Sequence, residues 1–69
     1  MPYINLQVTP AITREQKQAL VREFTDSLVR ILQKRPEHVH IVIQEIDEEN
    51  WGFTGMLADD YRAGITAGS

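Results

Sequence analysis

Pro2, directly after the initiator Met1, is the residue of this chain with the clearest route to proton-transfer chemistry. While Met1 is attached, the Pro2 nitrogen is an amide without basicity at neutral pH. If Met1 is removed, as is usual before a small residue, this nitrogen becomes a secondary amine that can act as a general base. Proline makes up about 5% of residues in average proteins, so a Met-Pro start by itself also fits a proline that merely opens a strand.

The length and composition predict one small domain over residues 1–69 that needs support from other subunits. Chains of this size bury only about 60% of their unfolded surface and commonly depend on a disulfide, a metal or a partner. The chain has no cysteine, and its two histidines, His38 and His40, lack neighbouring residues with metal-ligand spacing. We therefore predict no metal, no cofactor and a homo-oligomer.

Charge and hydropathy exclude two classes of partner. The formal net charge is -3, and the seven basic residues are dispersed, whereas binding to nucleic acid requires a concentrated basic face. No apolar stretch is long enough to span a membrane, and the N-terminus lacks the pattern of a signal peptide. We expect a soluble cytoplasmic protein with no nucleic-acid or membrane partner, and the absence of cysteine fits a reducing compartment.

Two stretches have the hydropathy pattern of strands. Residues 2–8 alternate between apolar and polar side chains, and residues 39–46 are almost continuously apolar, as in a more deeply buried strand. A helix between them makes a β-α-β unit, whose crossover places the two strands parallel. Because a two-stranded parallel sheet leaves backbone groups unpaired at its edges, neighbouring subunits are expected to supply strands or cover.

The connecting helix is predicted from about Arg14 to about Lys34. Thr13 and Gln16 have the spacing of a capping box at its start, and Pro36 closes it. Lys34 and Arg35 are expected near the negative helix end. The apolar stripe that should face the sheet comprises Leu20, Val21, Phe24, Leu28, Ile31 and Leu32.

The C-terminal third is predicted to be a short hairpin followed by less regular chain. Residues 50–55 carry two aromatic side chains separated by glycines, which permit tight turns. Residues 56–61 are expected to form a helical turn, and residues 63–69 to be loosely ordered without a partner. The acidic runs at 47–49 and 59–60 are interpreted as solvated turns and not as metal sites.

Five features, taken in one order along the chain, resemble the 4-oxalocrotonate tautomerase family. They are Pro2, the strand over residues 2–8, Thr13-x-x-Gln16-Lys17, the strand over residues 39–46 and Asn50-Trp51-Gly52-x-x-Gly55. The likeness runs from Pro2 to about Arg62. It implies an α+β fold, with a β-α-β tautomerase-type subunit, a parallel two-stranded sheet, one long helix and a C-terminal β-hairpin. Such subunits usually assemble as a hexamer of three dimers.

The resemblance also implies roles for particular residues. Pro2 corresponds to the family's catalytic general base, which carries a proton between oxygen and carbon of an enol or dienol. Two arginines that hold the carboxylates of a dicarboxylic substrate in the best studied members are replaced here by Ile12 and His40. Trp51 matches the aromatic residue that lines the family's pocket. We expect Ile12, His40, Trp51 and, after assembly, Arg62 to bind the substrate.

Each of these assignments has a structural alternative. His40 also fits a solvated strand residue, Trp51 an anchor at a subunit interface, and Arg62 a plain surface cation. Arg14 follows the pattern of the helix and is not counted as a substitute for a missing arginine. Phe53, like Met56, is expected to pack and not to line the site.

The predicted activity is an enol-keto tautomerisation of a small 2-hydroxy-enoate or arylpyruvate-type acid. A monoacid suits the site better than a diacid, because one cation or none opposes the substrate. The alternative from another class is a non-catalytic oligomeric module that binds ligands or only assembles. A dehalogenase or hydratase of the same superfamily ranks third, since the sequence shows no obvious extra carboxylate for activating water. Hexamer, trimer and dimer are not distinguished by the sequence.

Overall fold

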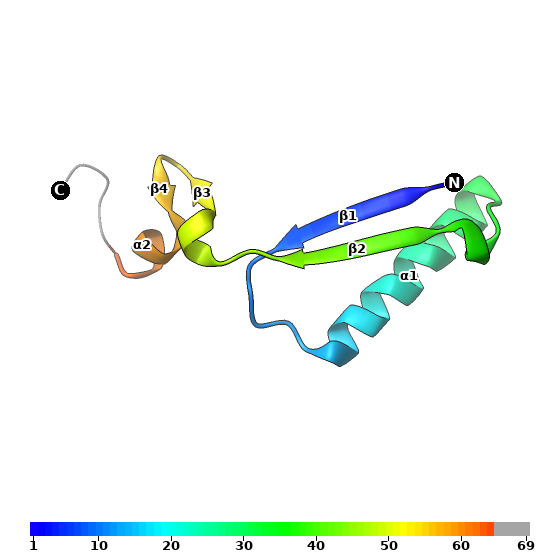
Figure 1. The fold of residues 1–69 in the computed structure, drawn as a ribbon, viewed down its shortest axis with the longest axis horizontal. Helices are drawn as coiled ribbons and strands as arrows, with labels where there is room; N and C mark the ends of the chain where they lie inside the picture. The colour runs from blue at the N-terminus through cyan, green and yellow to red at the C-terminus, as the bar shows by residue number, and fades with distance from the viewer. Residues whose placement is uncertain (65–69) are drawn as a thin grey trace.

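The computed structural model describes residues 1–64, and the predicted tail over residues 63–69 therefore lies largely outside the described residues. Figure 1 shows a two-stranded sheet with one long helix beside it and a separate small hairpin at the far end. The elements are β1 (Tyr3–Val8), α1 (Arg14–Leu32), the 3-10 turn η1 (Pro36–His38), β2 (His40–Glu45), the 3-10 turn η2 (Glu48–Asn50), β3 (Gly52–Phe53), β4 (Met56–Leu57) and α2 (Ala58–Arg62).

The β1–β2 sheet is parallel, as predicted, and its register runs from Tyr3 opposite His40 to Val8 opposite Glu45. Ile4 of β1 and its partner Ile41 are both half-buried, whereas the residues beside them along the strands are exposed. This alternation arises because successive side chains of a strand point to opposite faces. One face of the sheet is therefore partly covered, on the side where α1 lies (Figure 1).

Helix α1 begins as the capping box predicts. The N–H of Thr13 donates to Oε1 of Gln16 at 2.9 Å, and the N–H of Gln16 donates to Oγ1 of Thr13 at 3.1 Å. These two bonds satisfy backbone groups that the first helical turn leaves without partners. Within residues 1–64, no helix combines the length and the apolar character needed to cross a membrane.

The end of α1 differs from the prediction. The helix stops at Leu32, because Gln33 adopts a left-handed conformation with φ 56° and ψ 38°. Lys34 and Arg35 therefore lie just beyond the C-terminal end of the helix and not within its last turn. The basic residue in the last turn is Arg30.

The C-terminal hairpin pairs Gly52 with Leu57 and Phe53 with Met56. Its two loop residues, Thr54 and Gly55, both have positive φ, as in the type I′ turns that favour tight hairpins. The predicted helical turn over residues 56–61 is wrong at its start, since Met56–Leu57 is strand β4 and the helix begins at Ala58.

A single subunit leaves most of its apolar surface uncovered. Ala58, at 8% exposure, is the only buried residue among residues 1–64. Ile31 of the predicted apolar stripe is 65% exposed, and Leu32 and Val21 are exposed too. The chain exposes 5367 Å², whereas a compact 7.9 kDa monomer would expose about 4400 Å². Its radius of gyration, 16.3 Å, also exceeds the roughly 11 Å of a compact chain of this length.

Candidate active site

Pro2 occupies a fixed position directly before β1. Its carbonyl accepts a hydrogen bond from the N–H of His40 at 3.1 Å, which extends the pairing of the two strands by one residue. The Pro2 residue is half-buried, whereas Met1 is 82% exposed. The residue that blocks the proline nitrogen therefore extends into solvent in a single subunit.

His40 opens β2 beside Pro2. It is exposed and lies opposite Tyr3 in the parallel register, on the sheet face away from half-buried Val39 and Ile41. The contact of His40 with Pro2 is made by the backbone, and its exposed side chain shares a sheet face with that of Tyr3. Pro2 and His40 are the two predicted site residues that a single subunit brings together at this end.

Trp51 and Arg62 lie together at the other end of the molecule, around a cavity of about 370 Å³. The guanidinium of Arg62 forms an ion pair with Oε1 of Glu48 at 2.7 Å. Arg62 is 73% exposed at its side chain and Glu48 is 21% exposed, so the carboxylate is the more enclosed partner. The cavity is lined by Thr9, Glu48, Trp51, Phe53, Ala58, Tyr61 and Arg62.

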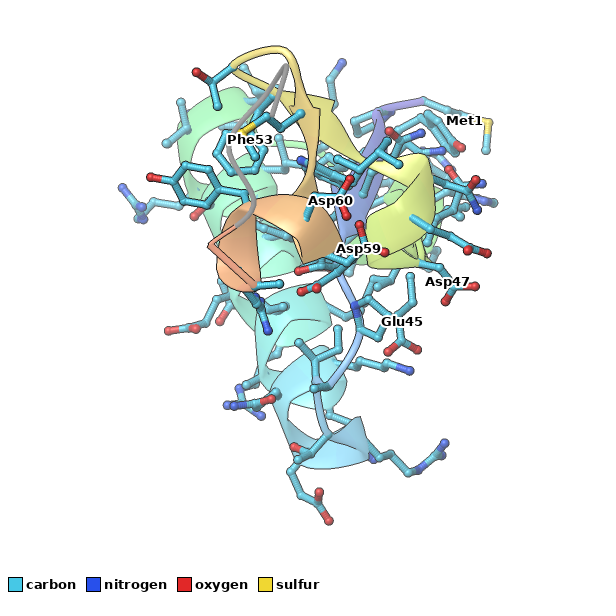
Figure 2. The ribbon with its side chains drawn as sticks, turned by 90° about the vertical axis from the view of Figure 1, so that its left-hand side faces the viewer. Met1, Glu45, Asp47, Phe53, Asp59 and Asp60 are labelled. Atoms are coloured by element: carbon cyan, nitrogen blue, oxygen red, sulfur yellow. The ribbon has the colours of Figure 1, made fainter. Side chains whose placement is uncertain are left out.

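Three of the five aromatic residues of the chain line this cavity. The rings of Phe53 and Tyr61 form a tilted pair, with their centroids 4.8 Å apart and their planes at 55°. Figure 2 views the molecule from this end, with Phe53 to one side of α2 and the carboxylates of Asp47 and Asp59 to the other. The cavity thus combines an aromatic wall with one ion pair.

Ile12 stands in the loop between β1 and α1, away from both groups. It is half-buried and lines a groove of about 360 Å³ along α1. Ala11, directly before it, has a φ of 84°, a conformation that L-residues rarely adopt. Lys17 of the first helical turns binds Glu45 at the end of β2, with 2.8 Å between Nζ and Oε2, and this contact ties the helix start to the sheet.

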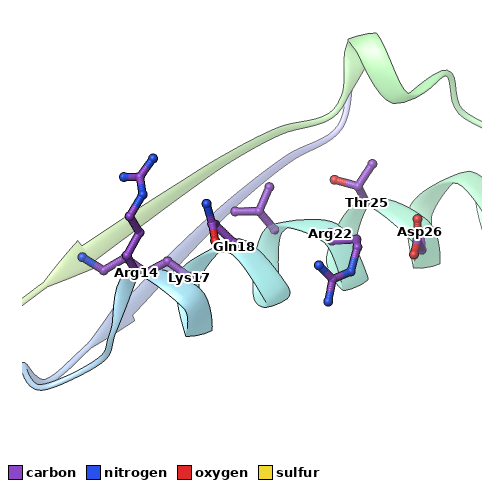
Figure 3. A pocket seen from close by; sticks show the side chains of 7 residues that line it. Arg14, Lys17, Gln18, Arg22, Thr25 and Asp26 are labelled. Carbon is purple, nitrogen blue, oxygen red and sulfur yellow. The ribbon is translucent and has the colours of Figure 1, made fainter.

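A further groove, of about 450 Å³, contains none of the predicted site residues. Figure 3 shows that its lining side chains all come from α1, among them Arg14, Lys17 and Arg22. Arg14 is the first residue of the helix, as the pattern predicts. A groove along a single helix lacks the converging polar groups that a catalytic pocket requires.

The predicted site residues therefore lie in three places on one subunit. Pro2 is at one end of a molecule that is 52 Å long, and Trp51 is beside the hairpin at the other end (Figure 1). A pocket that contains both residues requires at least two subunits.

Glu48 and Tyr61 line the cavity although no sequence pattern identifies them as site residues, and Phe53 lines it although the pattern predicts only packing. Glu48 belongs to an acidic run that fits a solvated turn equally well. Phe53 and Tyr61 meet only because the hairpin reverses the chain and α2 follows it directly. No spacing in the sequence signals this contact.

Comparisons with known proteins agree with this architecture. The family model described as tautomerase enzyme matches residues 2–61. Probable tautomerase K2 from Dickeya dadantii is 38% identical over 63 residues, which cover 90% of this chain and 94% of that protein. The 2-hydroxymuconate tautomerase from Pseudomonas putida is 30% identical over 60 residues, covering 87% of this chain and 95% of that protein.

A solved structure from the 4-oxalocrotonate tautomerase isozymes of Methylibium petroleiphilum has the same fold. It superposes with a TM-score of 0.88 at 33% identity, covering 91% of this chain and 98% of that chain. The family match, these relatives and the shared fold agree over nearly the whole length. This chain is an isomerase of the tautomerase family and one of its 4-oxalocrotonate tautomerase-like members.

Proposed function

We propose that this isomerase transfers a proton between oxygen and carbon of a small 2-hydroxy-enoate or arylpyruvate-type enol, with the amine of Pro2 as the general base. The observation that carries the proposal is the placement of Pro2, which is half-buried and hydrogen-bonded through its carbonyl to His40 at 3.1 Å. The exposure of Met1 supports the release of the proline nitrogen.

The chemistry needs no co-reactant. The Pro2 nitrogen takes the proton of the enol hydroxyl, and the oxygen electron pair forms the carbonyl. The displaced π electrons reach the far carbon of the conjugated system, which takes the proton back from the Pro2 ammonium group. Backbone N–H groups or the His40 imidazole would stabilise the negative charge on oxygen during the transfer.

The distribution of cations favours a monoacid substrate. Ile12 carries no charge, and Arg62 is already paired with Glu48 at 2.7 Å. His40 is the remaining candidate for binding a carboxylate near Pro2. A substrate with two carboxylates would leave at least one of them without a cationic partner, which is costly in a partly dehydrated pocket.

We infer that the working form is a homohexamer of three dimers. Two features of the subunit support assembly: its large exposed apolar surface, and the separation of Pro2 from Trp51 along the 52 Å molecule. Assembly would let the Pro2 of one subunit face the cavity of another. Native mass spectrometry tests this inference, and a monomer, dimer or trimer at working concentration would contradict it.

Steady-state assays with phenylenolpyruvate and 2-hydroxymuconate test the substrate class. The protein used should first be shown by intact mass to have lost Met1. We expect a higher kcat/KM for phenylenolpyruvate, because it carries one carboxylate and a ring. A clear preference for 2-hydroxymuconate would contradict the proposed substrate.

A further inference from the structure

The cavity beside the hairpin has the composition of a small-molecule site. Its volume, about 370 Å³, falls in the range of natural ligand pockets, which are mostly apolar with a few placed polar groups. Trp51, Phe53 and Tyr61 supply rings, and Glu48 and Arg62 supply the polar groups. None of the three residues is buried, since Phe53 and Tyr61 are exposed and Trp51 is half-buried.

The geometry of the Phe53–Tyr61 pair suits a third ring. The two planes meet at 55° with their centroids 4.8 Å apart, and the residues remain 44% and 55% exposed. A tilted pair offers both a ring face and a ring edge, which are the two surfaces that an added aromatic group prefers to contact. An aliphatic chain gains no such directional contact.

The ion pair limits which acids the cavity accepts. The guanidinium of Arg62 lies 2.7 Å from the carboxylate of Glu48, so the two groups largely neutralise each other. A carboxylate that entered the cavity would meet the enclosed Glu48 as well as Arg62, and the repulsion would oppose its binding. The aromatic rings favour contact with another ring, and the paired Arg62 offers little attraction to a carboxylate. Both features therefore favour binding of the uncharged ring end of a ligand.

We propose that Phe53 and Tyr61 are specificity-determining residues that bind the aryl ring of the substrate and select it over a second carboxylate. This inference rests on the proposed function, because it states which part of the proposed enol substrate, the aryl ring or the carboxylate, binds in the cavity. The carboxylate and the reacting carbons would then lie toward the Pro2 and His40 of the neighbouring subunit. The selectivity comes from ring contacts and from the absence of a free cation.

Equilibrium binding tests this proposal independently of turnover. Trp51 is the only tryptophan of the chain and lines the cavity, so its fluorescence reports on occupancy. The probes are 3-phenylpropionate, an unreactive aryl monoacid, and adipate, an unreactive straight-chain diacid. We expect the assembled wild-type protein to bind 3-phenylpropionate more tightly than adipate.

Two variants of Tyr61 isolate the ring. Tyr61→Leu removes it and should weaken binding of 3-phenylpropionate about three- to tenfold, the effect of one aromatic contact, with little change for adipate. Tyr61→Phe keeps the ring and should bind both probes as the wild type does. Phe53→Leu should repeat the effect of Tyr61→Leu.

Three results would overturn the inference. One is tighter binding of adipate than of 3-phenylpropionate by the wild type, and another is an unchanged affinity for 3-phenylpropionate in Tyr61→Leu. The third is a fall in assembly mass for Tyr61→Leu and Phe53→Leu, which would show that the rings are interface anchors. Failure of the proposed function would look different, since Pro2→Ala would then retain full turnover while the preference between probes persisted.

Discussion

The N–H of His40 donates a hydrogen bond to the carbonyl of Pro2 at 3.1 Å, so the residue that opens β2 is fixed beside the residue that precedes β1. The bond is a backbone interaction and does not depend on the side chain at position 40. The backbone of His40 is thereby fixed beside the proline, and the imidazole takes no part in that contact. Its role in substrate binding can be tested without moving Pro2.

Replacing His40 by alanine should lower kcat/KM for phenylenolpyruvate about tenfold or more. A hydrogen bond to a charged group contributes roughly 1.5–3 kcal/mol, and the Pro2–His40 backbone bond remains in the variant. His38→Ala is the matched control, because His38 is exposed and lies in η1, two residues before His40. Steady-state kinetics of both variants check the prediction, and equal effects of the two substitutions would refute it.

Releasing Arg62 from its ion pair should improve turnover of a diacid. Glu48→Gln removes the carboxylate that lies 2.7 Å from the guanidinium, so Arg62 becomes available to a second substrate carboxylate. We expect kcat/KM for 2-hydroxymuconate to rise at most about fivefold, because solvent screens this exposed cation. Glu37→Gln, which breaks the exposed Arg35–Glu37 pair of 3.3 Å, should leave it unchanged. A rise in both variants would point to overall charge and not to Arg62.

Thr13→Ala should destabilise the folded protein by about 1 kcal/mol, since the variant loses the side-chain acceptor for the N–H of Gln16. Thr13→Ser keeps a hydroxyl there and should retain most of the stability. Denaturant unfolding at one fixed protein concentration measures both, because the stability of an oligomer depends on concentration. Equal losses in the two variants would mean that the capping bond contributes little.

Substitutions at the two residues of the hairpin turn should change the stability of the protein in opposite directions. Thr54 is a β-branched residue with a φ of 50°, so Thr54→Asn should stabilise the protein by about 0.5–1 kcal/mol. Gly55 has a φ of 77°, and an added Cβ there would meet nothing within 4 Å. Gly55→Ala should therefore cost about 1–2 kcal/mol through backbone strain alone. Stability changes of the same sign for both substitutions would contradict the turn geometry.

Local signals explain how much of the fold could be predicted. Thr13 and Gln16 lie three residues apart, and the alternation of residues 2–8 is complete within one strand, so both elements follow from short stretches of sequence. The helix end was predicted less well, because glycine is the usual signal for a left-handed cap and Gln33 occupies that conformation here. Strand β4, which begins at Met56, does not follow from the sequence, since a two-residue strand has too few positions to show a hydropathy period.

The candidate site could be predicted only in part, for a different reason. The meeting of Pro2 and His40 follows from the parallel register of β1 and β2, which the β-α-β pattern implies. The Phe53–Tyr61 contact and the Glu48–Arg62 pair depend on how α2 packs against the hairpin and η2, which no periodicity encodes. The pairing of Pro2 with Trp51 depends on a second subunit, so neither the sequence nor one subunit specifies it.

The most direct test of the central claim compares turnover of phenylenolpyruvate by the wild type and by Pro2→Ala, after intact mass has shown that both have lost Met1. Because the variant exchanges the ring-held secondary amine for a freely rotating primary amine, we expect the wild type to be faster by about 10²-fold, the lower end of the contribution of a positioned general base. Circular dichroism and native mass must show that the variant keeps its fold and assembly. Equal rates for the two proteins would contradict the assignment of Pro2 as the base.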